Sequence, residues 1–352
     1  MKILLASEEI TNRPREGSLV FLMHLGRFLH SEGELTVVHA VGEFDPDIRT
    51  LRALSTKTLV TRELLRIARR ERFDVALYVP LSGLTAFGIA RGALLRSLTK
   101  SPTIAIGLQE RRVDRSHALL SAFGKPDLVL TPAASVRERL ERLGFDTGFI
   151  MPGYDARLFR PASPEMRARL KSKYDLPRDR YVLLHVGRIK ESRNLEILLR
   201  YRDWGPDVQP LVKAGELDPS WAHRLRMAGI IVIDEFLGDV HELYQASDCY
   251  FYPVNSPIGA IEIPLSVIEA CACNLPVLTT RFCALADAIR EGNGFCYYDR
   301  VSEIAEKIAA MRLSRPETAA KVKEFSWEKV FRTHLYPQMQ SLARESRGGG
   351  AL

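Results

Sequence analysis

Cysteine is scarce in this chain. Five cysteines occur among 352 residues, an odd number, and no two of them form a C-x-x-C pair. That spacing is typical of zinc and redox sites, so its absence argues against both. Most of the cysteines lie in apolar runs, as reduced core residues of a cytoplasmic protein do. We therefore expect no metal site, no disulfide framework and a cytoplasmic location.

A long uninterrupted apolar run is also missing. The nearest candidate, residues 75–95, is broken by Pro80, Gly83, Gly88 and Arg91. A membrane-spanning helix needs roughly 18 or more apolar residues in succession. The first six residues are too short for the apolar core of a signal peptide and read as a strand. We expect a soluble protein whose only contact with a membrane is peripheral, on its inner face.

Two nucleotide-related signatures are absent as well. No G-x-G-x-x-G follows a candidate strand, which removes the pyrophosphate turn of dinucleotide oxidoreductases. Basic residues are not interleaved with aromatics, and no helix-turn-helix, zinc or RNA-recognition motif is present. The sequence therefore predicts no nucleic-acid partner.

Positive charge is present and unevenly distributed. The net charge is +7, and residues 1–160 hold 24 basic and 18 acidic side chains, against 26 and 25 in the remainder. Arg62, Arg66 and Arg69 recur at helical spacing, and Arg111 and Arg112 form a second cluster. A solvated basic face is one interpretation. The other is a surface for an anionic acceptor or for lipid head groups, which attract basic segments.

Short β-rich runs alternate with stretches of helical spacing along the chain, among them residues 193–202. This alternation predicts βαβ units and parallel sheets. The runs cover residues 2–6, 35–40, 75–79, 103–107, 128–132, 181–187, 211–215, 230–234, 249–254, 276–280 and 294–298. Residues 152–180, rich in proline and charge, read as a linker with one short helix. The simplest account is α/β: two Rossmann-like, doubly wound domains that face each other across a cleft, the default ligand site.

The predicted domains are residues 1–155 and 156–330. Residues 331–352 are expected to form a helix that crosses back to the first domain, followed by a disordered tail. Pro337 interrupts the helical stretch 325–345.

The first candidate site directly follows the run 181–187. Gly187 lets the backbone turn and approach a ligand, and Arg188 and Arg193 follow it. Two guanidinium groups at the carboxyl end of a strand suit a diphosphate, because each can bind phosphate oxygens through two N–H groups. A solvated basic loop is the alternative.

The second candidate site is a predicted helix over residues 264–273. Pro264 suits its first position, so Pro264, Leu265 and Ser266 would form a helix start that binds an anion. Glu269 lies deep in this otherwise apolar helix, where a carboxylate needs a donor partner. That partner is either a ligand hydroxyl or a structural salt bridge.

A third stretch, residues 239–248, reads as an amphipathic helix that packs against the core. The loop before it, with Phe236 and Leu237, can hold a ring against backbone amides.

Five segments in this order resemble the GT-B glycosyltransferases, and within them glycosyltransferase family 4. They are PGYDARLFRP (152–161), LLHVGRIKESRN (183–194), the D-V-x-x-L-Y-x-x-S-D run (239–248), PLSVIEACACNLPVLTT (264–280) and FSW (325–327). The resemblance covers residues 150–330 strongly and the first half as topology only.

The resemblance implies a donor nucleotide sugar held mostly by the second domain and an acceptor held mostly by the first. It places Arg188 and Arg193 on the donor diphosphate and Glu269 on the ribose hydroxyls. The family's other glutamate, which touches the donor sugar, falls on Ile261 here, and Glu262 is displaced by one position.

Two further departures from the family lie in the first half. The glycine pair near the N-terminus is reduced to Gly17 and Ser18. The histidine after the fourth strand is missing, and His117, further on, is expected to be a packing or surface residue.

The implied activity is the transfer of a sugar from a nucleotide-diphosphate sugar to a hydroxyl of a glycan or lipid-linked acceptor. The family retains the anomeric configuration and needs no metal or other cofactor. Arg188, Arg193 and Glu262 are the expected catalytic residues. A nucleotide-sugar hydrolase or a sugar phosphorylase is a close variant. The alternative is a catalytically degenerate nucleotide-sugar-binding or scaffold protein, which the displaced Glu262 favours.

Overall fold

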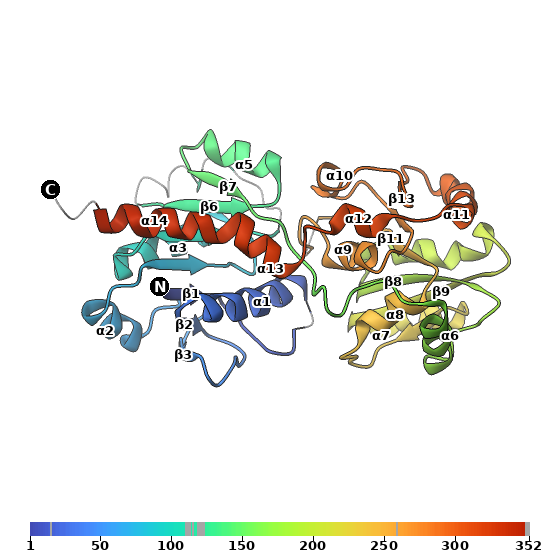
Figure 1. Cartoon of the computed structure of the whole chain (residues 1–352), viewed down its shortest axis with the longest axis horizontal. Helices are drawn as coiled ribbons and strands as arrows, with labels where there is room; N and C mark the ends of the chain where they lie inside the picture. Colours follow the sequence, from blue (N-terminus) through green and yellow to red (C-terminus); the bar gives the residue numbers. More distant parts are fainter. Residues whose placement is uncertain (15, 110–113, 115, 118–123, 258–259, 349–352) are drawn as a thin grey trace. The chain divides into compact units, whose positions relative to one another are not determined.

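The structure, a computed structural model, describes residues 1–14, 16–109, 114, 116–117, 124–257 and 260–348. Its chain divides into two compact units (Figure 1). Unit 1 comprises Met1–Pro152, Gly259–Glu262 and Trp327–Leu352, and unit 2 comprises Gly153–Ile258 and Ile263–Ser326. The chain passes from unit 1 to unit 2 after Pro152 and returns to unit 1 at Trp327. The expected tail, residues 349–352, lies outside the described residues.

Unit 1 is built on a sheet of seven strands in the order β3-β2-β1-β4-β5-β6-β7. All of its neighbouring strands are parallel. The strands are β1 (Lys2–Ala6), β2 (Glu34–His39), β3 (Arg49–Arg52), β4 (Val75–Tyr78), β5 (Thr103–Ile106), β6 (Leu128–Thr131) and β7 (Thr147–Phe149). The helices are α1 (Gly17–Glu32), α2 (Arg62–Arg70), α3 (Ala86–Thr99), α5 (Ala134–Glu141), α13 (Trp327–Val330), the π-helical turn η4 (Phe331–Leu335) and α14 (Tyr336–Gly348).

Unit 2 is built on a second parallel sheet, of six strands in the order β10-β9-β8-β11-β12-β13. The strands are β8 (Tyr181–Ile189), β9 (Val208–Leu217), β10 (Ile231–Ile233), β11 (Cys249–Tyr252), β12 (Val277–Thr279) and β13 (Phe295–Tyr297). The α-helices are α6 (Pro164–Lys173), α7 (Pro219–Met227), α8 (Val240–Ala246), α9 (Leu265–Ala272), α10 (Leu285–Ala288), α11 (Ile304–Leu313) and α12 (Thr318–Val322). The 3-10 helices are η1 (Glu191–Arg193), η2 (Leu195–Trp204) and η3 (Val301–Glu303).

These two sheets confirm the predicted α/β class and the two Rossmann-like units. Their central strands are buried on both faces, which is why they read as continuous apolar runs in the sequence. In each unit the strand order reverses once, between β1 and β4 in unit 1 and between β8 and β11 in unit 2. Ligands of such sheets bind beside the carboxyl ends of the strands at this reversal.

The end of the chain returns to unit 1. Trp327 packs edge-on against Phe21 of α1, with ring centroids 5.8 Å apart, and Arg332 pairs with Glu32 at 2.9 Å. Figure 1 shows α14, in red, among the blue and green elements of unit 1. Pro337 lies in the first turn of α14, directly after the π-helical turn η4. A proline ring clashes with a regular helix before it, and a π turn is one way to absorb that clash.

Some sequence-based expectations need correction. The helix expected over residues 193–202 begins at Leu195 and is a 3-10 helix. It cannot begin earlier as one helix, because Asn194 has a left-handed conformation (φ 55°) that separates η1 from η2. Strands β3 and β7 were not predicted. Both lie at the edges of the sheet of unit 1, where exposed or half-buried residues weaken the apolar signal.

Candidate functional site

The site in unit 2 begins at the carboxyl end of β8, beside the strand-order reversal. The register of β8 on β9 becomes irregular between Gly187 and Ile189, which turns the strand end. A methyl group on Gly187 would lie 3.1 Å from Nε2 of His185, closer than ordinary contact. Any larger residue at position 187 would press on a side chain on the same face of the strand, which would have to shift by a few tenths of an ångström. Arg188 is the next residue, still on β8 and half-buried.

Arg193 ends the short helix η1 and is buried, with 8% of its surface exposed. Burial raises the pKa of the Tyr252 hydroxyl, and the nearby Arg193 guanidinium opposes that rise. Arg193 is thus close to the carboxyl end of β11. The next residue, Asn194, fixes this placement because its Nδ2 donates to the carbonyl of Pro253 at 3.0 Å. The loop after β8 is anchored on the strand across the reversal.

The start of α9 belongs to the same region of unit 2. Pro264 is the residue before the helix and not its first residue, which corrects the prediction. Its extended ψ of 127° leaves the carbonyl to accept from the N–H groups of Val267 and Ile268. Tyr250 joins this helix to β8, because its hydroxyl donates to Val186 O at 3.3 Å and interacts with the Ser266 side chain. The predicted helix start and the predicted arginine loop are therefore neighbours.

Glu269 lies further along α9 and has a protein partner. Its Oε2 accepts a hydrogen bond from the hydroxyl of Tyr244 on α8 at 2.9 Å. Burial raises the pKa of Glu269 to about 7, and the Tyr244 hydroxyl opposes that rise. The protein partner of Glu269 is thus a neutral hydroxyl and not the cation of a salt bridge, which was one of the two alternatives. One tyrosine donor leaves the carboxylate with capacity to accept further hydrogen bonds.

Three more residues are predicted to contact the donor: Phe236, Leu237 and Glu262. Phe236 is exposed and Leu237 half-buried, in the loop that precedes α8. Glu262 belongs to unit 1, where its N–H donates to the carbonyl of Leu108 at 2.7 Å and its side chain is buried. Glu262 thus groups with unit 1, whereas Gly187 and Glu269 belong to unit 2.

Gly17 and Ser18 open α1 in unit 1. They follow β1, and the Ser18 hydroxyl is buried and accepts from Nε2 of Gln109 at 3.4 Å. His117 is 2% exposed, and its Nε2 lies 3.0 Å from Leu84 O. His117 is therefore a packing residue and not a surface residue.

The basic residues predicted for the acceptor side are only partly described. Arg62, Arg66 and Arg69 lie on α2 and are all exposed, as their helical spacing predicts. Arg111 and Arg112 lie outside the described residues.

Sequence reasoning missed one polar cluster, at the strand-order reversal of unit 1. Glu8 accepts from the hydroxyl of Tyr78 at 2.8 Å and from the N–H of Leu81 at 3.0 Å, and it pairs with Arg91. Both charged side chains of the pair are 13% exposed. The only signal in the sequence is the position of Glu8 just after β1, since its partners lie 70 or more residues away.

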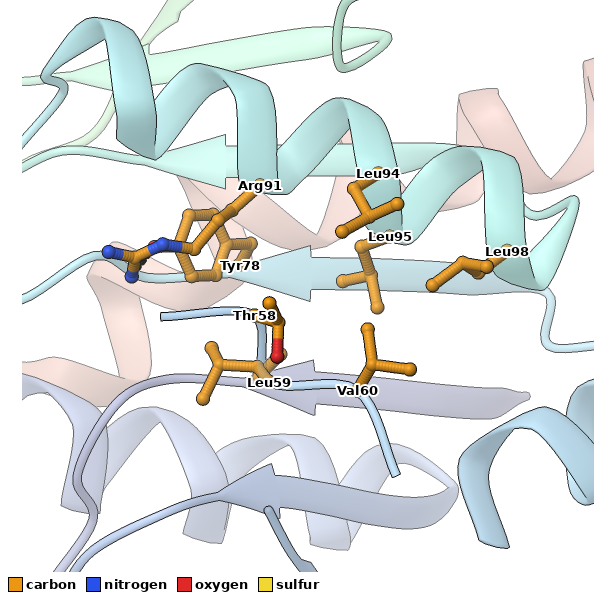
Figure 2. Close-up of a pocket in the computed structure, with 9 residues that line it drawn as sticks. Thr58, Leu59, Val60, Tyr78, Arg91, Leu94, Leu95 and Leu98 are labelled. Atoms are coloured by element: carbon orange, nitrogen blue, oxygen red, sulfur yellow. Dashed lines mark hydrogen bonds between the residues drawn. The ribbon is translucent and has the colours of Figure 1, made fainter. Parts of the chain in front are cut away.

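A small cavity adjoins this cluster (Figure 2). Its volume is about 10 Å³, enough for one water molecule. Figure 2 shows Tyr78 and Arg91 side by side at one end, with leucines of α3 facing the stretch Thr58–Val60. Glu8, Tyr78 and Arg91 bind one another here, Nε of Arg91 stays without a partner in the described residues, and the cavity is too small for a substrate.

Within the described ranges, no three or more His, Cys, Asp or Glu side chains gather in a way that suits a metal ion. Over the same ranges, no helix combines the length and the apolar character needed to cross a bilayer.

Residues 180–312 match the family described as glycosyl transferases group 1. The chain is 29% identical over 230 residues to a D-inositol 3-phosphate glycosyltransferase of Thermomonospora curvata, covering 58% of this chain and 50% of that protein. It is 28% identical over 221 residues to a GDP-mannose-dependent alpha-(1-6)-phosphatidylinositol dimannoside mannosyltransferase of Mycobacterium tuberculosis, covering 58% and 55%. The chain thus spans about half the length of these curated relatives.

Solved structures match nearly the whole chain. The Anabaena protein HepE in complex with UDP superposes with a TM-score of 0.75 at 15% identity, over 97% of this chain and all of that one. A glycosyltransferase from Rickettsia africae gives a TM-score of 0.75 at 15% identity, over 98% of both chains. At this level of identity the likeness establishes the fold alone.

Proposed function

Because the chain has the GT-B fold and resembles the family 4 glycosyltransferases, we propose that it transfers a sugar from a nucleotide-diphosphate sugar to a hydroxyl of a glycan or lipid-linked acceptor. One observation carries the proposal. The strand-order reversal of unit 2 gathers Gly187, Arg188, Arg193 and the start of α9, inside the segment that matches glycosyltransferases. HepE, which shares the fold, was crystallised in complex with UDP, and this supports a nucleotide-linked donor.

The proposed chemistry is stabilisation of the leaving group. As the bond between sugar and diphosphate breaks, negative charge builds on the diphosphate. Arg188, Arg193 and the N–H groups at the start of α9 are fixed donors that meet this charge without reorganising. A diphosphate oxygen then takes the proton of the attacking hydroxyl, so the sugar is delivered with retention and without a metal ion.

Glu269 is proposed to bind the ribose. A carboxylate accepts hydrogen bonds from vicinal hydroxyls, and the Tyr244 hydroxyl holds its Oε2 in place. Phe236 and Leu237, in the loop before α8, are proposed to contact the base.

The exposed arginines of α2 are proposed to bind an anionic acceptor or the anionic head groups that carry it. Arg62, Arg66 and Arg69 share one face of α2, and each basic residue near an anionic surface contributes roughly 1 kcal/mol. Such binding would hold a cytoplasmic enzyme on the inner face of a membrane. Sedimentation with anionic vesicles at low and high salt tests this, and the absence of salt-sensitive binding would remove the membrane part of the proposal.

Donor binding is tested first, by thermal shift against UDP, GDP, ADP and their sugars. A ligand present at a hundred times its dissociation constant adds roughly 2.7 kcal/mol of apparent stability. Product analysis by NMR, with and without acceptors and with EDTA, then separates transfer from hydrolysis and phosphorolysis. We expect a retained anomeric configuration and no effect of EDTA. A chain that binds none of these nucleotides refutes the proposed function.

A second candidate is a protein that binds the nucleotide sugar without turnover. The observation in its favour is the placement of Glu262 in unit 1, since the family's sugar-contacting glutamate is replaced by Ile261. Calorimetry distinguishes the two candidates. Tight nucleotide binding with no product on a broad donor and acceptor panel would establish the second.

A further inference from the structure

His185 lies at the strand-order reversal of unit 2, on β8 and two residues before Gly187. It is 1% exposed, and its ring faces that of Tyr252 on β11 with centroids 6.2 Å apart. No role for it follows from the sequence pattern. It is nevertheless a titratable group buried at the carboxyl end of the central strand.

The hydrogen bonding of His185 fixes its tautomer. Nδ1 lies 3.0 Å from the carbonyl oxygen of Phe251, and a carbonyl only accepts, so Nδ1 carries the hydrogen and donates. Burial lowers the pKa of His185 to about 4, helped by the nearby charge of Arg193. The ring is therefore neutral at physiological pH, and Nε2 presents a lone pair that can only accept.

Nε2 has no hydrogen-bond partner in the described part of the chain, although it is fully buried. Leaving a buried acceptor unpaired costs about 1–3 kcal/mol, and native proteins keep few such groups. The nitrogen is directed toward Gly187, which has no side chain to cover it: a methyl group there would lie 3.1 Å from it. A ligand that approaches the Gly187 backbone therefore meets an acceptor.

The chemistry of Nε2 restricts that ligand group. An ionised phosphate oxygen is itself only an acceptor and gains nothing from a neutral imidazole nitrogen. A hydroxyl group donates, and in a nucleotide sugar hydroxyls flank the diphosphate on both sides, on the ribose and on the sugar. We infer that His185 Nε2 accepts a hydrogen bond from a donor-substrate hydroxyl, which makes His185 a specificity-determining residue. This inference rests on the proposed function.

Two substitutions separate the acceptor from the ring's structural role. His185→Asn keeps an amide N–H near the Phe251 carbonyl and withdraws the acceptor, whereas His185→Gln places an amide oxygen near the former Nε2. The matched control is Tyr298→Phe, which removes another buried polar atom of unit 2 that lacks a partner among the described residues. Circular dichroism and melting temperature establish that each variant is folded.

Calorimetry with UDP-glucose, UDP, GDP-mannose and GDP gives the readout. We expect His185→Asn to bind the accepted nucleotide sugar roughly three- to tenfold more weakly, His185→Gln to recover part of the loss, and Tyr298→Phe to bind like the wild type. Weakening of the nucleotide sugar alone assigns the hydroxyl to the sugar. Equal weakening of the free nucleotide assigns it to the ribose, and 2′-deoxy and 3′-deoxy nucleotides then identify the position.

Unchanged affinities in a folded His185→Asn protein overturn the inference and leave the proposed function intact. A wild-type chain that binds no nucleotide instead refutes the proposed function, and the His185 assignment falls with it. If neither variant folds, a crystal structure of the wild type with UDP-glucose or GDP-mannose decides. Nε2 bonded to Arg193 or to water, with no ligand hydroxyl within hydrogen-bond distance, overturns the inference.

Discussion

At the strand-order reversal of unit 1, charged and polar side chains pair with one another, and Nε of Arg91 alone in this cluster lacks a partner among the described residues. At the reversal of unit 2, a neutral imidazole nitrogen that lacks a partner in the same residues lies against a glycine. In unit 1, Ser7 donates to Val79 O at 2.9 Å, and Glu8 binds Tyr78, Leu81 N and Arg91. In unit 2, His185 Nε2 keeps unused acceptor capacity, and Gly187 has no side chain beside it. The two sheets have similar strand orders, but their strand-order reversals differ in how much hydrogen-bonding capacity they leave for a ligand.

This difference has a physical basis. A network whose members satisfy one another stabilises the fold and gains little from a ligand. A buried group left unpaired costs stability and recovers that cost when a ligand supplies the partner. We therefore expect substitutions at the reversal of unit 1 to change stability, and substitutions at the reversal of unit 2 to change donor binding and turnover.

The largest effect is expected at Arg188. Arg188→Ala removes a donor to the departing diphosphate, and we expect turnover to fall by roughly 10²–10³-fold or more while the melting temperature stays near that of the wild type. Arg200→Ala is the control, because Arg200 is 64% exposed on η2 and pairs only with Asp203 at the surface in the described structure. Steady-state kinetics with the identified donor measures both. Turnover like the wild type in a folded Arg188→Ala protein would contradict the role.

At Glu8 we expect the opposite pattern, a loss of stability with no change in nucleotide affinity. Glu8→Gln leaves the Arg91 guanidinium buried beside a neutral amide, and we expect the free energy of unfolding to fall by roughly 2–4 kcal/mol. Nucleotide affinity should be unchanged once the folded fraction is accounted for. Glu138→Gln is the control, since its pair with Arg142 is exposed. Denaturant titration and calorimetry measure the two quantities. Lost nucleotide affinity without lost stability would remove the contrast between the units.

Stability as a function of pH tests the buried groups of unit 2. The pKa of Glu269 is raised from 4.5 to about 7, so the folded state keeps a proton on this carboxyl group. The contribution of Glu269 to the free energy of unfolding therefore falls as the pH rises from 4.5 to 7. The pKa of His185 is lowered from 6.5 to about 4, so the folded state keeps this ring neutral. The contribution of His185 to the free energy of unfolding therefore falls as the pH falls from 6.5 to 4.

These two dependences have opposite signs and can be separated. Relative to the wild type, we expect Glu269→Gln to gain stability as the pH rises and His185→Asn to gain as it falls, each by about 2–3 kcal/mol across the window. Urea denaturation at half-unit steps between pH 4.5 and 7.5 measures the curves. Variant curves that run parallel to the wild-type curve would show that these groups do not titrate as described.

The smallest effect is expected at Gly187. Gly187→Ala places a methyl group against His185 Nε2, and we expect donor affinity to fall by about tenfold with little loss of stability, since the strand end can shift by a few tenths of an ångström. Gly92→Ala on α3 of unit 1 is the control, because its methyl group would make only ordinary contacts at 3.7 Å. Equal donor affinity in both variants would argue against a ligand approaching Gly187.

Much of this architecture could be predicted from the sequence. The central strands were found because burial on both faces makes them continuous apolar runs, as in β1, β8 and β11. The edge strand β3 was missed because three of its four residues are exposed. The helix expected at 193–202 was misjudged because nothing in the pattern shows that Asn194 adopts a left-handed conformation.

The candidate site was predicted in part, for similar reasons. The glycine and arginines follow β8 directly, so topology alone places them at a carboxyl end. The tyrosine partner of Glu269 comes from another helix, 25 residues away in sequence, and Glu8 and Arg91 lie 83 residues apart. Such pairings depend on the fold. Glu262 shows the same limit, because its distance in sequence from Pro264 does not reveal that it groups with unit 1.

The proposed function depends most on where a nucleotide binds, and a crystal structure of the chain with UDP or GDP measures this directly. We expect the diphosphate to lie at the carboxyl ends of β8 and β11, within hydrogen-bond distance of Arg188 and of the N–H groups that begin α9. A nucleotide held at the reversal of unit 1, with the Arg188 guanidinium away from every phosphate oxygen, would contradict it.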